Sequence, residues 1–193
     1  MRATAVCGIM MLVGLVGLPT RLWAETPIQA LQQTIDRVQT LVHDPGLSEE
    51  HRTDQVLETI LARFDVQEMA KRILGPYWDQ PQAQQEAFVM EFTAFLKRLL
   101  GGHLAQIKAL HVTCRAETIH GSRAHVLADL STRGQAFPMN FRMHQQGVGW
   151  RIYDVLLDQG SFSLVRSYGT QLQWILRSSS FEQVLRLIRE KHT

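Results

Sequence analysis

Histidine is the residue type in this sequence that most readily suggests chemistry, because the chain contains eight of them. His111, His120, His125 and His144 lie in or beside a segment where apolar and polar residues alternate. A metal site would need Cys, Asp or Glu partners at a recognised ligand spacing, and none of these four histidines has one. We therefore interpret them as polar strand or surface side chains, and the sequence predicts no metal site and no cofactor.

Two carboxylates and one thiol are the remaining candidates for catalysis. Asp154 and Asp158 stand near the end of an expected strand, where paired carboxylates could divide acid and base roles, but a capping or turn role is favoured. Cys114 alternates with apolar residues, which is typical of a small buried side chain rather than a nucleophile. No catalytic residue is predicted. A small α+β isomerase or hydrolase using Asp154, Asp158 or a histidine as its base is kept as the alternative.

Helices are expected to position the first half of the chain. Each of four segments combines an N-cap or proline start with an apolar stripe of helical period, which predicts a helix. Their starts are Thr26-Pro27, Ser48, Asp65 and Pro81. Gly75-Pro76 ends the third helix, and Gly101-Gly102 either ends or kinks the fourth.

The second half of the chain changes character after Leu110, where the hydrophobic period falls from about 3.6 to 2. Turns that divide this segment into four strands are expected at His120-Gly121, Gly134 and Gln146-Gly147. Two more helices follow, starting at Ser161 or Ser163 and at Ser180. This order predicts an α+β domain in which a four-stranded antiparallel sheet packs against several helices.

The last hairpin brings large apolar side chains together in either of two registers. A two-residue turn places Met143 opposite Trp150 and Phe141 opposite Ile152, whereas a four-residue loop places Phe141 opposite Trp150. The same face of the sheet carries these side chains in both cases.

The first 24 residues have the pattern of a signal peptide. Arg2 supplies a thin positive region, residues 5–18 are apolar, and Leu22-Trp23-Ala24 is a cleavage site of the right kind. We expect residues 1–24 to be removed, with a retained signal anchor as the alternative. Residues 25–193, 169 in number, are then enough for a single domain with a sizeable core.

Charge and cysteine content exclude further classes. The 20 Lys and Arg residues include Arg2 and Arg21, so the mature chain has 18 basic residues against 18 acidic ones. This balance gives no basic excess for binding nucleic acid. Cys114 alone survives removal of the signal peptide, so no intrachain disulfide is expected.

Bulky apolar side chains on helices and strands leave two interpretations open, an ordinary core and a ligand pocket. Close packing is the usual state of protein interiors, so the pattern alone favours the core. A pure interaction module without a cavity is therefore one hypothesis for the whole chain.

Short motifs that follow one another in order along the chain point to a specific family. They are Phe64-Asp65-Val66, Leu74-Gly75-Pro76-Tyr77-Trp78, Phe88 with Phe92, Trp150-Arg151-Ile152-Tyr153-Asp154-Val155, and Ser163-Leu164-Val165 with Tyr168. As an ordered set they resemble the toluene-tolerance, or MlaC, family of periplasmic lipid-binding proteins, over nearly all of the mature chain. Two features depart from the family pattern: the segment from Asp154 to Ser163 is two residues longer, and Gly169 replaces the usual Arg. These differences resemble the hopanoid-associated branch, HpnM, or another divergent branch.

The resemblance implies a sheet and helices that enclose an apolar cavity. It implies a soluble periplasmic carrier that shuttles phospholipid or a hopanoid-type lipid between inner- and outer-membrane components of an ABC-type transport system. Its partners would be that lipid and the membrane-bound transporter components. The residues expected to bind lipid are Phe88, Phe92, Met139, Phe141, Met143, Trp150, Ile152, Tyr168 and Leu172. Tyr77 and Trp78 are expected mainly to pack, and Met143→Asn, at the cavity rim, is expected to fold but to hold less lipid.

Overall fold

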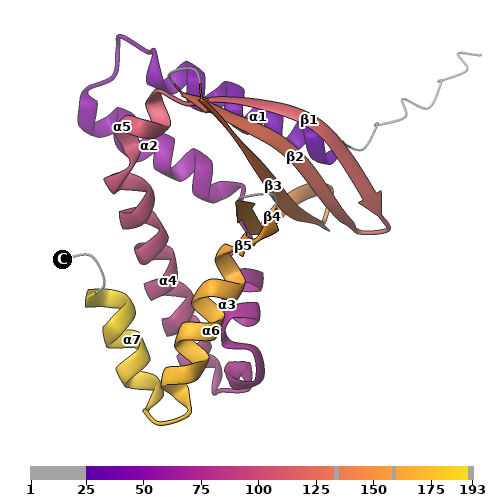
Figure 1. Cartoon of the computed structure of the whole chain (residues 1–193). Coiled ribbons are helices and arrows are strands. Elements are labelled where there is room, and N and C mark those ends of the chain that lie inside the picture. The colour runs from indigo at the N-terminus through magenta and orange to yellow at the C-terminus, as the bar shows by residue number, and fades with distance from the viewer. Residues whose placement is uncertain (1–24, 133–134, 158–159, 191–193) are drawn as a thin grey trace, which may run out of the picture.

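The computed structural model describes residues 25–132, 135–157 and 160–190. The expected signal peptide, residues 1–24, and Asp158 lie outside the described residues. Figure 1 shows an upper half, which contains the sheet, α1 and α2, and a lower half made of helices. The helix α4 runs along both halves and ends beside α2 and α5.

The first three helices begin where the sequence predicts, because their starts are fixed by local hydrogen bonds. Their bounds are α1 (Pro27–Val42), α2 (Glu49–Ala62) and α3 (Val66–Leu74). Thr26 and Gln29 form a reciprocal capping box at α1, and the side chains of Ser48 and Asp65 cap α2 and α3. The sequence signals at these positions are therefore confirmed.

The segment after α3 contains a short 3₁₀ helix, η1 (Gly75–Trp78), which carries the expected aromatic pair Tyr77 and Trp78. Both rings are half-buried against the helical core, so the predicted packing role is confirmed. The long helix α4 (Gln82–Gly102) ends at the glycine pair rather than bending there. A further helix, α5 (Leu104–Lys108), follows at once; it was not predicted, because five residues are too short for a periodic signal.

The sheet has five antiparallel strands, in the order in which they occur in the chain, not the four that were predicted. The strands are β1 (His111–His120), β2 (Arg123–Thr132), β3 (Gln135–Gln146), β4 (Gly149–Leu157) and β5 (Phe162–Ser163). The additional strand β5 pairs with Leu156 and Leu157 of β4. It was missed because two residues show no alternation. The α+β class is confirmed.

Both predicted registers of the last hairpin are wrong. The turn residues are Gly147 and Val148, so Gln146 pairs with Gly149 and Met143 pairs with Ile152. Gly147 has φ 61°, a conformation that suits glycine at the first turn position. Tyr153 is then an extra residue in β4, which forms a bulge before Arg142 pairs with Asp154. The apolar side chains still converge on one face.

Two helices complete the chain, α6 (Leu164–Leu176) and α7 (Phe181–Glu190). Ser163, the second of the two predicted alternatives, caps α6. Gly169 is buried where α6 crosses α3, and a Cβ there would lie 3.3 Å from the carbonyl oxygen of Ile73. This close approach explains why a residue that lowers helix propensity stands in the middle of α6.

Two main hydrophobic cores correspond to the two halves. The upper core joins α1 to the inner face of the sheet and includes Leu31, Val126, Met143 and Ile152. The lower core lies among α3, α4, α6 and α7. The halves meet at a joint where the backbone N–H of Asp65 donates to the Ile152 carbonyl at 2.8 Å and the Ile152 N–H donates to the Arg63 carbonyl at 2.8 Å.

Candidate functional site

The principal candidate site is an apolar cavity of about 470 Å³ in the upper half. Its walls come from α1, the C-terminal end of α4, α5 and the inner face of the sheet. Side chains that represent these walls are Leu31, Ile35, Leu99, Ile107, Met139 and Phe141. Apolar groups line nearly all of it, so the cavity suits hydrocarbon rather than a polar substrate.

The few polar side chains in the wall are engaged by the protein itself. Arg63 donates to the Thr34 hydroxyl at 2.7 Å and to the Trp150 carbonyl at 3.0 Å. Gln39 Nε2 donates to the Leu110 carbonyl at 3.3 Å. Burial lowers the pKa of the Arg63 guanidinium, although an arginine stays charged. Arg63 therefore sets a charged inner boundary for the cavity.

The rim of the cavity is apolar and partly open to solvent. Leu157 and Phe162 line the cavity and are 39% and 45% exposed. His103, also in the lining, is exposed at the end of α4. An elongated apolar ligand could therefore lie inside while a polar end remains at this rim.

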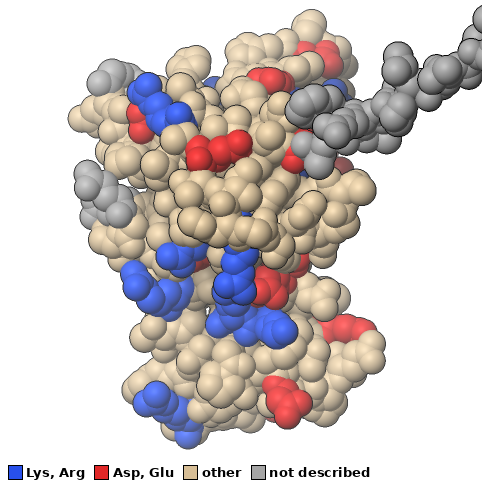
Figure 2. Space-filling model, turned by 90° about the vertical axis from the view of Figure 1, so that its right-hand side faces the viewer, with Lys and Arg blue, Asp and Glu red and all other residues tan. Residues whose placement is uncertain are grey.

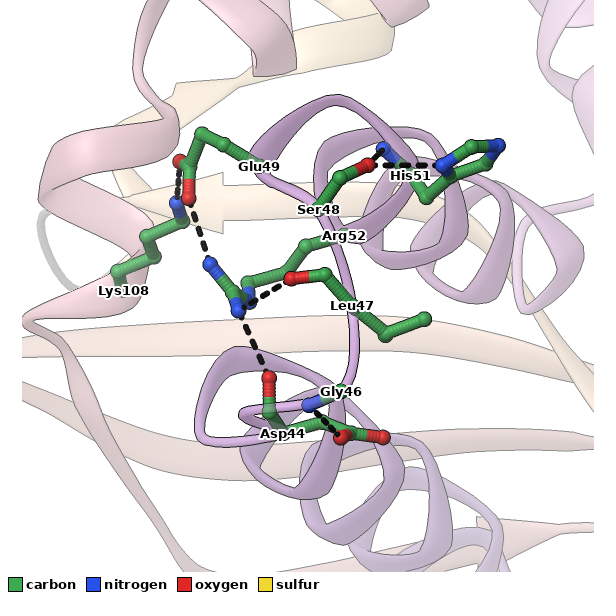
Figure 3. A network of polar contacts seen from close by, with 8 residues as sticks. All are labelled: Asp44, Gly46, Leu47, Ser48, Glu49, His51, Arg52 and Lys108. Atoms are coloured by element: carbon green, nitrogen blue, oxygen red, sulfur yellow. Dashed lines mark hydrogen bonds and ion pairs between the residues drawn. The ribbon is translucent and has the colours of Figure 1, made fainter.

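A polar network ties the helix α5 to the loop between α1 and α2, and so positions one cavity wall (Figure 3). Glu49 accepts from both Arg52 and Lys108, and these hydrogen bonds lower the pKa of its carboxyl. Arg52 also donates to the carbonyls of Asp44 and Leu47, at 2.7 and 2.8 Å. This network fixes α5 against the start of α2, and α5 carries Ile107 into the cavity wall.

The predicted site residues of the strands separate into three groups. Met139, Phe141 and Ile152 line the cavity. Met143 is 0% exposed and packs in the upper core outside the lining, so its expected position at the rim is wrong. Trp150 lies behind the cavity wall, where its Nε1 donates to the Glu25 carbonyl at 2.9 Å.

The predicted site residues of the helices do not line this cavity. Phe92, Tyr168 and Leu172 border a second apolar cleft, of about 400 Å³, between α4, α6 and α7. Phe88 is 0% exposed in the lower core and lines neither space. The sequence does not show to which half of the fold an apolar helix residue belongs. Phe88, Phe92, Tyr168 and Leu172 were therefore predicted to share one site with the strand residues.

Much of the cavity wall was missed from the sequence. The stripe on α1, with Leu31, Ile35 and Val38, is readable by its period but looks the same whether it faces a core or a cavity. Leu99 and Leu100 near the end of α4 were likewise available as apolar positions. Ile107 was hidden in a helix too short to predict.

Asp154, the candidate base, does not face the cavity. It is 3% exposed and accepts from the Ser163 hydroxyl at 2.7 Å and from the Val165 N–H at 3.1 Å. Arg142 lies 3.4 Å from the same carboxylate. The predicted capping role is confirmed, since Asp154 holds the first turn of α6.

A third pocket lies between α3, α6 and the strands β3 and β4. Figure 2 shows Lys and Arg side chains gathered about halfway down one face of the molecule. Arg72, Arg142 and Arg166 contribute to its lining. Arg72 pairs with Glu68 at 2.6 Å and lies 4.2 Å from the centre of the Tyr153 ring. With Arg142 beside Asp154, most of this charge is already balanced within the protein.

Cys114 and His144 each lie against other groups of the protein. Cys114 is half-buried against the upper core, and burial, with a smaller effect of Asp36, raises the pKa of its thiol. His144 Nε2 lies 2.9 Å from the carboxylate of Asp65, the cap of α3. Among the described residues no group of three His, Cys, Asp or Glu side chains is placed to hold a metal ion.

In the part of the chain that the structure describes, no helix has the length and apolar character to cross a membrane.

A family model described as MlaC protein matches residues 29–190. A solved structure, described as a phospholipid-binding protein from Ralstonia solanacearum in complex with a phospholipid, is similar in fold. Its TM-score is 0.73 with 19% identity, over 87% of this chain and 96% of that chain. None of the curated proteins compared with the chain matches it.

Proposed function

Because the chain belongs to the MlaC family, we propose that it is a lipid carrier that holds acyl chains in the apolar cavity of its upper half. The observation that carries the proposal is this cavity, whose wall is almost wholly apolar and whose rim reaches solvent. The phospholipid bound by the structural neighbour supports the same ligand class. With Asp154 occupied as a helix cap on the other side of β4, a carrier is favoured over an enzyme.

The cavity volume suits a long hydrocarbon chain. A methylene needs roughly the same ~30 Å³ as a water molecule in the liquid, so 470 Å³ holds about 15 of them. At about 0.8 kcal/mol for each buried methylene, such a chain gains on the order of 12 kcal/mol relative to water. Ordering the chain offsets part of this gain, and the remainder still retains a lipid during passage through water.

The finer proposal concerns the setting. We propose that the carrier works in the periplasm after removal of residues 1–24. There it would exchange phospholipid or a hopanoid-type lipid with the inner- and outer-membrane components of an ABC-type transport system. A polar headgroup would remain at the rim formed by Leu157 and Phe162, where a partner could receive it.

Native mass spectrometry of protein purified without detergent tests the proposal. We expect bound lipid, and transfer of that lipid between liposomes. Met139→Asn should lower lipid occupancy, because Met139 lines the cavity but is only partly buried, so the fold tolerates the change. Leu127→Asn is the matched control, since Leu127 is 48% exposed and lies on the other face of the sheet. Reproducible absence of lipid in the wild-type protein, without transfer between liposomes, would refute the proposal.

A further inference from the structure

A polar pocket of about 550 Å³ is a feature that the proposed function leaves unexplained. It lies where α1 and the end of α2 meet the hairpin between β3 and β4, and we call it the arginine pocket because Arg37, Arg63 and Arg151 line it. Among the described residues of its lining there is no Asp or Glu. Guanidinium groups bind phosphate and carboxylate, so the pocket suits an anion.

Arg63 is held in position before any ligand arrives. Its side chain is 19% exposed, and its hydrogen bonds to the Thr34 hydroxyl and the Trp150 carbonyl fix the guanidinium. Burial lowers the pKa of Arg63, the carboxylate of Glu25 at 3.9 Å opposes this effect, and the like charge of Arg151 adds to it. Arg63 and Arg151 therefore repel each other, and an anion in the pocket would relieve the repulsion.

The other two arginines keep donors for a ligand. Arg37 is exposed on α1 and forms no ion pair with the residues that the structure describes. Arg151 donates to the Ala62 carbonyl at the end of α2, which uses only part of the five N–H donors that a guanidinium carries. In the pocket between α3 and α6, by contrast, Arg72 and Arg142 each pair with a carboxylate. The arginine pocket therefore carries the less balanced charge.

The arginine pocket and the cavity rim lie far apart. Thr34 and Arg63 line both the pocket and the apolar cavity, so the hydrogen bond between them lies in a shared wall. The rim, however, is at Leu157, and the pocket is at Gly149, at the other end of β4. Eight steps of about 3.3 Å along the strand place them about 26 Å apart. A carried lipid whose headgroup stays at the rim therefore leaves the arginine pocket to another anion.

The apolar tip of the hairpin indicates which anion the pocket takes. Val148 lines the arginine pocket and is 92% exposed. A dissolved anion gains nothing from an apolar side chain. At a membrane surface, apolar side chains enter the hydrocarbon boundary while basic side chains bind the anionic headgroups above it. We propose that the arginine pocket and Val148 form a docking site for an anionic membrane surface, in which the pocket takes the phosphate of one surface lipid.

This docking goes beyond the proposed function, because it needs neither the cavity nor a carried lipid. Residues 25–193 hold 18 basic and 18 acidic side chains, so the attraction comes from the local arrangement of charge and not from a net charge. With the arginine pocket on the membrane, the rim at Leu157 lies at the other end of β4 and stays open to a partner.

Binding to vesicles tests the docking site. Protein purified without detergent is mixed with vesicles of phosphatidylcholine alone, or of phosphatidylcholine and phosphatidylglycerol in equal parts. One arginine near an anionic surface changes the affinity about fivefold, so we expect the three to make binding to the neutral vesicles about 100-fold weaker. Arg37→Gln should weaken binding to the anionic vesicles about fivefold, and Val148→Asn, which loses the burial of a valine, about tenfold. Both side chains are exposed, so the thermal midpoint should not change.

Matched variants separate this site from general electrostatics. Arg177→Gln removes an exposed arginine at the end of α6, in the lower half, and should leave vesicle binding unchanged, as should Leu127→Asn. Equal weakening by Arg37→Gln and Arg177→Gln would overturn the inference, and so would equal binding to both kinds of vesicle. Inorganic phosphate that binds in the absence of any vesicle binding, and is lost in Arg37→Gln, would assign the pocket to a dissolved anion instead.

A fluorescent reporter and the carried lipid give two further measurements. Val148→Trp should shift its emission to shorter wavelength on anionic vesicles, whereas Leu127→Trp should not. Arg37→Gln and Val148→Asn should retain any lipid that native mass spectrometry finds in the wild-type protein. Carried lipid without vesicle binding would overturn the docking site alone. Vesicle binding without carried lipid would support the docking site and count against the carrier.

Discussion

Replacement of Asp154 tests whether this carboxylate is a structural cap or a base. Its two oxygens accept from the Ser163 hydroxyl and from the Val165 N–H, both within the buried start of α6. Arg142 adds an ion pair at 3.4 Å, but its side chain is 38% exposed, so this pair contributes at most about 1 kcal/mol. The buried hydrogen bonds therefore dominate the effect of a substitution.

The expected magnitude follows from the donors that are left behind. In Asp154→Ala, the Val165 N–H and the Ser163 hydroxyl lose their acceptor, and a buried unsatisfied group costs about 1–3 kcal/mol. The hydroxyl can rotate, so its share falls at the low end, and we expect a total loss of about 2–4 kcal/mol in unfolding free energy. Asp154→Asn keeps one carbonyl oxygen as an acceptor, and its loss should be about 1–2 kcal/mol.

Urea unfolding at pH 7 measures both variants against a control in the same sheet. Asp129→Ala removes a carboxylate whose partner Arg115 is 62% exposed, and its cost should be about 0.5 kcal/mol. Equal stability of Asp154→Ala and wild-type protein would refute the cap. A larger loss of unfolding free energy in Asp154→Asn than in Asp154→Ala would refute it as well. A catalytic Asp154 predicts instead two stable variants that both lose turnover of an apolar substrate.

Two further substitutions test the packing of the lower half. Gly169→Ala should destabilise the protein although alanine favours helix by about 1 kcal/mol, because its Cβ would lie 3.3 Å from the Ile73 carbonyl oxygen on a rigid neighbouring helix; a rise in the thermal midpoint would contradict this. Glu91→Gln removes the pair with Arg189, at 2.5 Å, that joins α4 to α7, and should cost about 0.5–1 kcal/mol at pH 7. The hydrogen bond from Arg189 lowers the pKa of Glu91 below its ordinary 4.5, so the difference between variant and wild type should persist above that value and vanish as the pH falls through the lowered pKa. A stability difference between Glu91→Gln and wild type that stays constant down to acid pH would refute a stabilising role for this ion pair.

Local signals explain which parts of the fold the sequence could predict. Thr26, Ser48, Asp65 and Ser163 each accept from the backbone N–H three residues on, so their patterns predict helix starts without knowledge of the tertiary structure. The bulge at Tyr153 has no such signal, because it depends on how β4 pairs with β3. The register of the hairpin was wrong for the same reason, since the position of Gly147 within the turn decides the whole ladder.

The candidate site was harder to predict than the fold. An apolar side chain follows the same period whether it meets another side chain or empty space, so Met139, which lines the cavity, could not be told from Met143, which is in the core. Whether a strand residue lines the cavity or packs in the core depends on how closely α1 approaches the sheet at that position. That approach is determined by residues elsewhere in the chain, so the sequence around Met139 or Met143 does not predict it.

The motifs that carry the family resemblance lie mostly at the joint between the two halves. Asp154 and Ser163 belong to two motifs that meet in one hydrogen bond, Phe64 pairs with Ile152 across the joint, and Trp150 ties down the start of α1 through Glu25. These contacts fix β4 relative to α1 and to the start of α6, around the cavity. Its wall is built largely from aliphatic side chains that the motifs do not specify. The motif residues therefore position the sheet against the helices, while side chains of α1, α4 and α5 determine the shape of the cavity.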